Sequence, residues 1–480
     1  MNPIKMGNRR ELFWDEYLID TALTNAYLKQ HPPVAKEIVY SFDKPWEGDS
    51  GGYWNILKLG DTYRMYYIIR NMFTEDGKDL EKHKMRINVM ESKDGIHWTS
   101  PMMDIRPFEG QKTNTLLDGG DAFTFDNFYV FVDENPNCPP EEKFKATSRI
   151  DRSGYLWCWV SADGIHWKKG WAMTNRGTFD SLNVAFWSPE HGKYFCFIRG
   201  FHNMFGPNEW DGIRDIRVIT SSDFHNWSDP QMLDFGSSAE DYELYTNMVH
   251  RYPRAPHVMV GFPTRYIERN IWTGNYDQLP DPKNRQERMK VDRRLGLAMT
   301  DCMMMTSRDG FHWKRGDEAW IDPGIEATYN WQYGNCYPSV GLIETPSDIP
   351  GAPDEYSLFM GEGPWGKLPM YLRRYTIRMD GFRSYRADNA PCILTTKPIL
   401  YVGGKLHLNF STSAKGYIYV TMRRRENRND FYEIHSCEIF GNSLDRIVPF
   451  EGDMEQFVGK EVVLEFKMSD ADLYSMQFTD

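Results

Sequence analysis

Aromatic side chains are the residues of this sequence best suited to contact a ligand directly. They make up 15% of the 480 residues and include 16 Trp and 27 Tyr. A flat ring can stack on the apolar face of a sugar, and aromatic residues also fill the half-buried faces of β-strands. The candidate stacking platforms are Trp54, Trp187, Trp331 and Trp365. For each of them, core or rim packing is the alternative interpretation.

Arginines form a second group that could do chemistry. Arg199 and the pair Arg214-Asp215 lie ahead of one copy of a repeated motif described below. A guanidinium group offers a rigid fork of donors to a carboxylate or to neighbouring hydroxyls, so these arginines would suit an acidic sugar. Together with His202, they would also suit phosphate. An ion pair between structural units is the alternative.

A motif of seven residues, Ser-x-Asp-x-x-x-Trp, recurs along the chain. Its four clear copies are Ser92–Trp98, Ser161–Trp167, Ser221–Trp227 and Ser307–Trp313, and Asp380–Tyr385 resembles a degenerate fifth. The motif predicts a tight turn in which Asp accepts bonds from backbone N–H groups, Gly adopts a positive φ and Trp packs beneath. We interpret it as structural and do not count its His residues as catalytic.

The spacing of the motif predicts a β-propeller. The five aspartates lie 60 to 86 residues apart, which fits a four-stranded blade with loops of variable length. Short β-like runs precede the copies at 87–90, 157–160, 216–220, 302–306 and 375–378. Further strands are predicted at 53–59, 62–68, 183–188, 194–199, 258–262 and 356–360. The polar segment 270–294 is predicted to be a loop insertion at one rim.

The repeat ends near Ala390, and a second unit follows. Alternating strands are predicted at 393–402, 405–411, 416–423, 432–438 and 462–468, with a last strand at 470–478 that docks on the rest. We therefore expect an all-β protein, with a five-bladed propeller over residues 1–388 and a C-terminal β-sandwich over residues 389–480. The predicted role of the sandwich is structural support, with sugar binding as the alternative.

Composition excludes several kinds of partner. The net charge is −12, and the only Lys/Arg block is Arg423–Arg425, which argues against nucleic acid. No apolar run approaches the length of a membrane span. Residues 1–10 lack the apolar core of a secretory signal, which leaves a cytoplasmic protein, or a periplasmic or secreted one without its signal. The seven Cys include no CxxC pair, so we expect mostly reduced, buried thiols and no structural disulfide.

The Ser-x-Asp-Gly-x-x-Trp turns, the five-fold count and the trailing sandwich resemble the five-bladed propeller glycosidases of glycoside hydrolase families 32, 43 and 117. The opening Glu11-Leu-Phe-Trp-Asp-Glu-Tyr-Leu-Ile19 is similar to the start of a bacterial group described as glycosyl-hydrolase-like. This resemblance spans nearly the whole chain. It implies a hydrolase that acts on a plant or algal poly- or oligosaccharide through two or three carboxylates at the channel mouth.

The resemblance also implies where those carboxylates lie, because in these families they come from the innermost strands of successive blades. One acid protonates the leaving oxygen, while a carboxylate activates water or attacks carbon. In the first blade the candidate is Asp49, with Glu47 as the alternative. In the second it is Asp133, at the end of the apolar run Tyr129–Val132, with Asp121 as a weaker choice.

The third and fourth blades depart from the family pattern. Asp180 precedes the third blade's first strand, where families 32 and 43 have a Glu acid, and Glu243 precedes the fourth. We take Glu243 as the acid and Asp49 or Asp180 as the base. A loop or capping role is the alternative for each carboxylate.

Two other functions stay open at the level of sequence. A glycoside phosphorylase would use phosphate in place of water, bound by Arg199, His202 and Arg214. A non-catalytic glycan-binding protein would bind without turnover. A sialidase fits less well, because that fold has six blades. We expect no organic cofactor; a structural Ca²⁺ in the channel is the one metal considered, although no EF-hand-like loop occurs.

Overall fold

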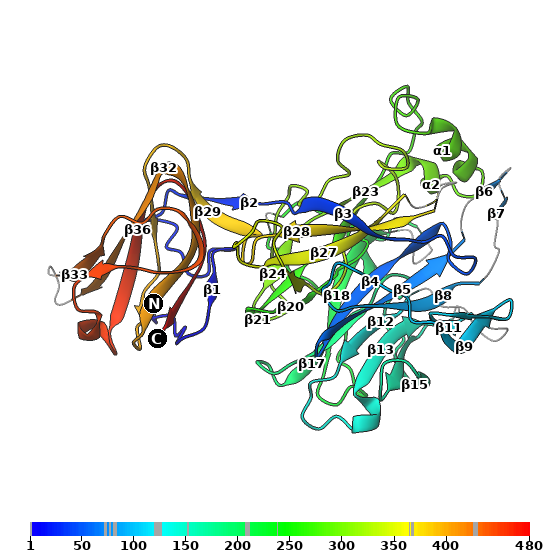
Figure 1. Cartoon of the computed structure of the whole chain (residues 1–480), viewed down its shortest axis with the longest axis horizontal. Coiled ribbons are helices and arrows are strands. Elements are labelled where there is room, and N and C mark those ends of the chain that lie inside the picture. Colours follow the sequence, from blue (N-terminus) through cyan, green and yellow to red (C-terminus); the bar gives the residue numbers. More distant parts are fainter. Residues whose placement is uncertain are drawn as a thin grey trace.

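The architecture was examined in a computed structural model of the chain. It describes residues 2–71, 74–75, 78–79, 84–119, 127–150, 153–206, 212–237, 239–363, 365, 369–425 and 431–480. These residues form two bodies, a propeller and a smaller sheet structure that carries both chain termini (Figure 1). The predicted all-β fold, a five-bladed propeller followed by a β-sandwich, is confirmed.

Five four-stranded antiparallel sheets make up the blades in the described part of the chain. Blade one contains β4 (Ser50–Leu59), β5 (Thr62–Arg70), β8 (Arg86–Ser92) and β11 (Thr115–Asp118). Blade two contains β12 (Tyr129–Val132), β13 (Phe144–Arg149), β14 (Leu156–Ser161) and β15 (Lys168–Thr174). Blade three contains β16 (Val184–Ser188), β17 (Lys193–His202), β18 (Ile213–Ser221) and β19 (Gln231–Met232). Blade four contains β20 (His250–Tyr252), β21 (Ala255–Gly261), β24 (Met305–Ser307) and β25 (Trp313–Arg315).

Blade five closes the ring with a strand from the opposite end of the chain. Its first three strands are β26 (Ile343–Thr345), β27 (Glu355–Glu362) and β28 (Tyr371–Ile377). The fourth is β3 (Val34–Ser41), which pairs antiparallel with β28. Pairing of an N-terminal strand with the last blade ties the first and fifth blades together, so the ring does not open between them.

Asparagines fix neighbouring blades at the level where their first strands begin. The Asn127 side chain donates to the carbonyl of Phe179, and the Asn247 side chain donates to the carbonyl of Leu182. The starts of β12, β16 and β20 therefore lie at one end of the channel, which we call the mouth end. The repeated turns follow the third strands and lie at the other end, the turn end.

The repeated turns have the predicted structural form. Asp163 accepts hydrogen bonds from the backbone N–H groups of Ile165 and His166, each at 2.8 Å, and Gly164 has φ +73°. The His166 ring contacts the second Asp163 oxygen at 2.7 Å, and the Trp167 indole donates to the Gly164 carbonyl. In the third copy, Phe224 takes the Gly position with φ 63°.

Smaller elements extend the blades. They are the hairpins β6 (Thr74–Glu75) with β7 (Lys78–Asp79), β9 (Met103–Phe108) with β10 (Gln111–Thr113), and β22 (Thr264–Glu268) with β23 (Ala298–Cys302), and the 3₁₀ turn η1 (Pro140–Glu142). Between β22 and β23 the chain forms helices α1 (Pro282–Met289) and α2 (Arg294–Leu297). The prediction of a loop over 270–294 was therefore wrong for α1, whose start is set by Pro282 and by Asp281 accepting from the Asn284 backbone.

The second body is one ten-stranded sheet, counted over the described residues, around its own apolar core. Its strands are β1 (Glu11–Leu12), β2 (Tyr27–Gln30), β29 (Arg383–Ala387), β30 (Cys392–Thr395), β31 (Ile399–Leu400), β32 (Lys405–Arg425), β33 (Phe431–Ser436), β34 (Asn442–Ile447), β35 (Phe450–Glu451) and β36 (Glu461–Thr479), with the 3₁₀ turn η2 (Met454–Phe457). The long strands β32 and β36 each span two predicted strands, and their pairing shifts register between Thr412 and Tyr417. The strands β1, β2 and β29 precede residue 389, so this sheet contains strands from both sides of the predicted domain boundary. The position of that boundary stays a prediction.

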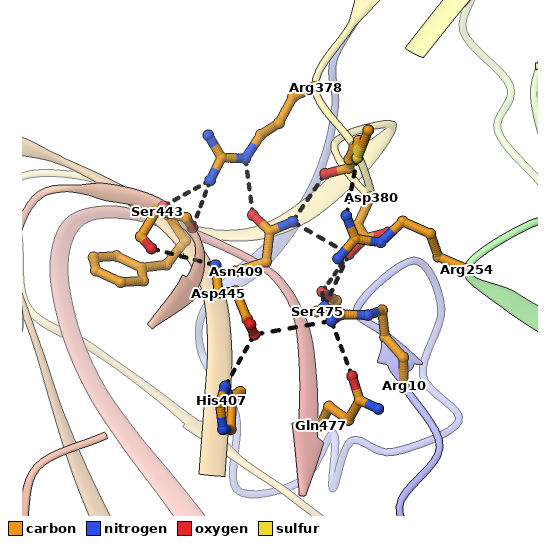
Figure 2. Close-up of polar contacts among 12 residues, drawn as sticks. Arg10, Arg254, Arg378, Asp380, His407, Asn409, Ser443, Asp445, Ser475 and Gln477 are labelled. Carbon is orange, nitrogen blue, oxygen red and sulfur yellow. Dashed lines mark hydrogen bonds and ion pairs between the residues drawn. The ribbon is translucent and has the colours of Figure 1, made fainter. Parts of the chain in front are cut away.

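Asp380, the aspartate of the degenerate fifth motif, joins the two bodies (Figure 2). Its side chain is fully buried and accepts from the Tyr252 hydroxyl and, as Figure 2 shows, from the Ser475 hydroxyl, each at 2.7 Å. Arg10 and Arg254 lie within 3.3 Å of its two oxygens. The carboxylate thus links the N-terminal segment, blade four and the sandwich in place of capping a turn.

Two further properties concern the whole chain. All seven cysteines are free, and Cys158, Cys196, Cys302 and Cys336 are buried. In the residues that the structure describes, no helix is long and apolar enough to cross a membrane.

Candidate functional site at the channel mouth

Two predicted carboxylates are held by two predicted arginines at the mouth end. Asp180, just ahead of β16, pairs with Arg199 on β17, and Glu243, ahead of β20, pairs with Arg214 at the start of β18. The Asp180 and Glu243 side chains are 22% and 31% exposed, so solvent reaches both carboxylates. The paired strands explain this placement, since β17 ends and β18 begins at the mouth.

Shared aromatic rings bring the two ion pairs together. The Tyr245 ring lies 4.6 Å from the guanidinium carbon of Arg199 and 5.8 Å from that of Arg214. The Phe201 ring lies 5.5 Å and 5.7 Å from the same two carbons. Each guanidinium therefore packs on rings that the other also contacts, which rigidifies the pair of sites.

Asp49 joins the cluster from blade one through Trp365. Its backbone carbonyl accepts from the Trp365 backbone N–H at 2.8 Å, and the Trp365 ring lies 5.8 Å from that of Tyr333. The Tyr333 hydroxyl in turn donates to the Tyr245 hydroxyl at 2.8 Å. A continuous set of contacts thus connects blades one, three and four. We call Asp49, Asp180, Glu243 and their arginine and aromatic neighbours the mouth cluster.

Electrostatics couple the same residues. Burial opposes the charged form of Arg199, but Asp180 and the nearby Tyr245 and Tyr53 together raise the pKa of its guanidinium. Burial raises the pKa of Tyr53 well above its usual value, and Tyr245 and Tyr333 contribute. Tyr53 therefore stays protonated and can serve as a hydrogen-bond donor. Arg199 stays charged and forms an ion pair with Asp180.

A bulge aims Tyr53 into this region. The pairing of β4 with β5 shifts register between Gly52 and Asn55, and Tyr53 has φ 55°. Such a bulge re-aims the side chains of an innermost strand. Tyr53, Arg70, Tyr333 and Trp365 line a cavity of about 30 Å³ among the described residues.

The structure does not bring Asp133 to the mouth. Asp133 follows the end of β12, six residues beyond Asn127, which corresponds to about 20 Å of extended strand. Its buried carboxylate accepts from Lys145 and from the Tyr194 hydroxyl, each at 2.7 Å. Asp133 therefore lies at the turn end, in an ion pair within blade two that Tyr194 of blade three also contacts.

The remaining candidates have varied positions. Trp54 is 1% exposed and packs against Phe42 and Tyr67 in a blade core, so its faces are closed to a ligand and the stacking role was wrong. Glu47 is buried and accepts from the Tyr40 hydroxyl and the Lys44 backbone. Burial raises the pKa of Glu47, but no contact connects it to the mouth cluster in the described residues. Asp121 lies outside the described residues.

His202 lies beside the mouth, between two carboxylates. Its Nδ1 is 3.1 Å from Asp215, and its Nε2 is 3.0 Å from Asp241. Of the other tryptophans, Trp365 takes part in the mouth cluster, with Arg70 stacked 5.5 Å from its ring. Trp187 packs on Tyr194, whose hydroxyl bonds Asp133, so it lies toward the turn end.

Sequence reasoning missed several members of the cluster. Arg70, Tyr245, Tyr333 and Tyr337 occupy segments without a repeated motif. The one usable signal was Arg70, which lies two residues beyond the predicted strand 62–68 and ends β5, as Arg199 ends the predicted strand 194–199. No three His, Cys, Asp or Glu side chains gather in the described residues in a way that could hold a metal ion.

Comparisons with known proteins return similar folds and no similar sequences. No family model and no curated protein matches the chain. A Bacillus subtilis arabinoxylan arabinofuranohydrolase of glycoside hydrolase family 43 matches over 94% of this chain and 99% of its own, with 11% identity and a TM-score of 0.39. The catalytic domain of a Coprinopsis cinerea family 62 α-L-arabinofuranosidase matches over 72% and 97%, with 8% identity and a TM-score of 0.44. An N-acetylgalactosamine deacetylase from F. plautii matches over 73% and 94%, with 13% identity and a TM-score of 0.42.

The likeness is one of fold. At these identities and TM-scores we draw no conclusion about activity from the matched proteins, because one fold carries many chemistries.

Proposed function

We propose that the chain is a glycoside hydrolase that cleaves a poly- or oligosaccharide at the channel mouth. The observations that carry the proposal are the ion pairs of Asp180 with Arg199 and of Glu243 with Arg214, which share aromatic rings, and the backbone hydrogen bond that joins Asp49 to them through Trp365. Glycoside hydrolysis needs two carboxyl groups across the scissile bond, one to protonate the leaving oxygen and one to attack or to activate water.

The two ion pairs help to assign the catalytic acid and the base or nucleophile. Asp180 pairs with the buried Arg199, whose side chain is 3% exposed, and Glu243 pairs with the more exposed Arg214, whose side chain is 14% exposed. An ionised carboxylate suits the base or nucleophile, whereas the acid must hold a proton at the start of the reaction. We therefore assign the base or nucleophile to Asp180 and keep Glu243 as the acid on condition that substrate draws Arg214 away from it. Asp49 holds the sugar.

Phosphorolysis is the second candidate, and one observation favours it. Arg70 stacks on Trp365 and lines the mouth cavity, and it forms no ion pair within the described part of the chain. Such a cation could hold a phosphate that replaces water as the attacking group. Arg199 and Arg214 are less suited to this role, because each is already paired with a carboxylate.

The test is sugar release from a panel of plant and algal polysaccharides and oligosaccharides, with and without phosphate. We expect Asp180→Asn and Glu243→Gln each to lower kcat at least 100-fold. Glu91→Gln is the matched control, because Glu91 is 31% exposed, as Glu243 is, and pairs with Arg64 at 2.8 Å at the far end of β8. It should retain wild-type turnover.

The outcomes separate the candidates. Turnover that requires phosphate and is lost in Arg70→Gln would replace hydrolysis by phosphorolysis. Wild-type turnover in both Asp180→Asn and Glu243→Gln would rule out the assigned carboxylates. Binding of glycans without turnover by any form would leave a glycan-binding protein.

A further inference from the structure

A larger cavity lies between blades three and four, beside the mouth cluster. It has a volume of about 460 Å³, within the range of small-molecule sites. Its walls come from the end of β17, the start of β18, β19, residues 233–236, 239–242 and 244, and β25. We call it the groove.

The groove shares a wall with the mouth cluster. The Arg214 side chain lines the groove and also bonds Glu243. The next residue after Glu243, Leu244, lines the groove too, and its backbone N–H donates to the Arg214 carbonyl at 3.0 Å. A ligand that fills the groove therefore lies one side chain away from Glu243.

The charged groups of the groove are largely neutralised by each other. His202 lies between Asp215 and Asp241, and Arg217 also pairs with Asp215 at 2.9 Å. In the empty site Arg214 pairs with Glu243, so the described residues of the wall next to the mouth offer no unpaired guanidinium. The lining also includes Asp234 and Glu240, so acidic residues outnumber basic ones there. This excess of negative charge disfavours an acidic ligand.

The groove is built before a ligand arrives. The Arg315 guanidinium lies between two rings, 4.8 Å from Phe235 and 4.7 Å from Tyr242, and its side chain is 3% exposed. It also donates to the backbone carbonyl of Glu240. Together with the His202–Asp241 contact, this holds Phe235, Asp241 and Tyr242 in place, so little ordering cost remains for binding.

The lining combines carboxylate acceptors with apolar surface. Ile216, Leu233 and Leu244 supply the apolar part, and Asp234, Glu240 and Asp241 supply acceptors. Hydroxyl groups around an apolar carbon ring match this combination, since each hydroxyl donates to a carboxylate while C–H groups meet the aliphatic side chains.

We propose that the groove binds a further neutral sugar unit of the substrate, next to the unit held at the mouth. This inference rests on the proposed function and deepens it. The substrate is then an oligosaccharide or polysaccharide of neutral sugars that spans mouth and groove, and uronic-acid chains are poor ligands.

The test fills the groove from its exposed rim. Met232 lines the groove and is 52% exposed, so Met232→Trp should reduce the volume without disturbing the core. Met102→Trp is the matched control, because Met102 is 48% exposed and lies in blade one. Glu240→Gln is a second groove variant that preserves size.

Neutral and uronic-acid oligosaccharides of two to five units are titrated by calorimetry, and turnover is compared between oligosaccharides and the glycosyl fluoride of the released sugar.

We expect Met232→Trp to weaken binding of neutral oligosaccharides at least fivefold and to lower their kcat/KM at least tenfold. Turnover of the glycosyl fluoride, which occupies only the mouth, should stay within twofold of wild type. Equal binding by Met232→Trp and Met102→Trp, or tighter binding of uronic-acid chains, would overturn the proposal. If no form turns over any glycan, the proposed function fails, but the titration still decides whether the groove binds sugar.

Discussion

At the scale of single residues, position along a strand decides what a carboxylate does. Asp133 and Asp180 both border an innermost strand, but Asp180 precedes β16 and Asp133 follows β12. All innermost strands run in the same direction, so the two carboxylates lie at opposite ends of the channel. Asp133 therefore neutralises buried Lys145, while solvent reaches Asp180 at the mouth.

Asp133→Asn should affect stability more than activity. The side chains of Asp133 and Lys145 are 0% and 3% exposed, and removal of the Asp133 carboxylate leaves buried Lys145 with the more exposed Glu142, 3.3 Å away, as its counter-charge. We expect a loss of about 3–5 kcal/mol in the free energy of unfolding, with kcat close to wild type where the protein remains folded. Urea unfolding and turnover measured together test this. A 100-fold loss of kcat at unchanged stability would instead support a catalytic role for Asp133.

His250 should make the propeller acid-sensitive. Burial lowers the pKa of its imidazole from 6.5 to about 4, so the unfolded chain takes up a proton more readily than the folded one. This group therefore leaves the free energy of unfolding unchanged above pH 6.5 and lowers it as the pH falls toward 4. At pH 5 the loss is about 2 kcal/mol. His250→Gln should unfold with a shallower pH dependence over this range. Parallel pH dependences for variant and wild type would contradict the assignment.

At the scale of elements, the repeated turns stabilise blades without taking part in chemistry. Their aspartates have pKa values below the usual range, because hydrogen bonds from backbone N–H groups and from the neighbouring His, or from Asn226 in the third copy, outweigh the effect of burial. These turns lie at the end of the propeller opposite the mouth.

Asp163→Ala should therefore cost stability alone. It removes the acceptor of two backbone N–H groups, and we expect a loss of about 1–2 kcal/mol with unchanged kcat. Asp61→Ala, at an exposed hairpin position, is the control and should change the free energy of unfolding by less than about 0.5 kcal/mol. A thermal melt and a turnover assay suffice, and reduced kcat in Asp163→Ala would show that the turn reaches the site.

At the scale of the whole molecule, Asp380 couples the propeller to the sandwich (Figure 2). Its carboxylate has partners in both bodies and none of its surface is exposed. Its removal takes the counter-charge from Arg254 and leaves Arg10 with Asp445, 3.9 Å away.

Asp380→Ala should separate the unfolding of the two bodies. We expect a loss of about 3–5 kcal/mol and a calorimetric melt with two transitions in place of one. Asp388→Ala is the control, because Asp388 is 67% exposed and contacts Arg386 at 3.3 Å at the sandwich surface. A single transition at an unchanged temperature in Asp380→Ala would show that other contacts couple the bodies.

Signals between residues close in the chain predicted much of the fold. Four motif copies at blade-length spacing predicted the propeller, and alternation of apolar residues placed most strands within a few residues of their ends. Pro282 and Asp281 are start signals for α1 that lay within a segment interpreted as loop. The signals that worked are those that act between residues close in the chain, such as turns and alternation.

Long-range pairing was beyond such signals. The sequence by itself determined that this is a repeated β-protein with carboxylates at strand ends, because turn chemistry and strand periodicity are local properties. Only the tertiary structure decided that β3 closes blade five, that Asp380 joins two bodies, and that Asp180 and Glu243 share a mouth from which Asp133 is absent. Each of these depends on the direction in which strands cross the ring and on which distant segment pairs with which, and neither is a property of residues near each other in the chain.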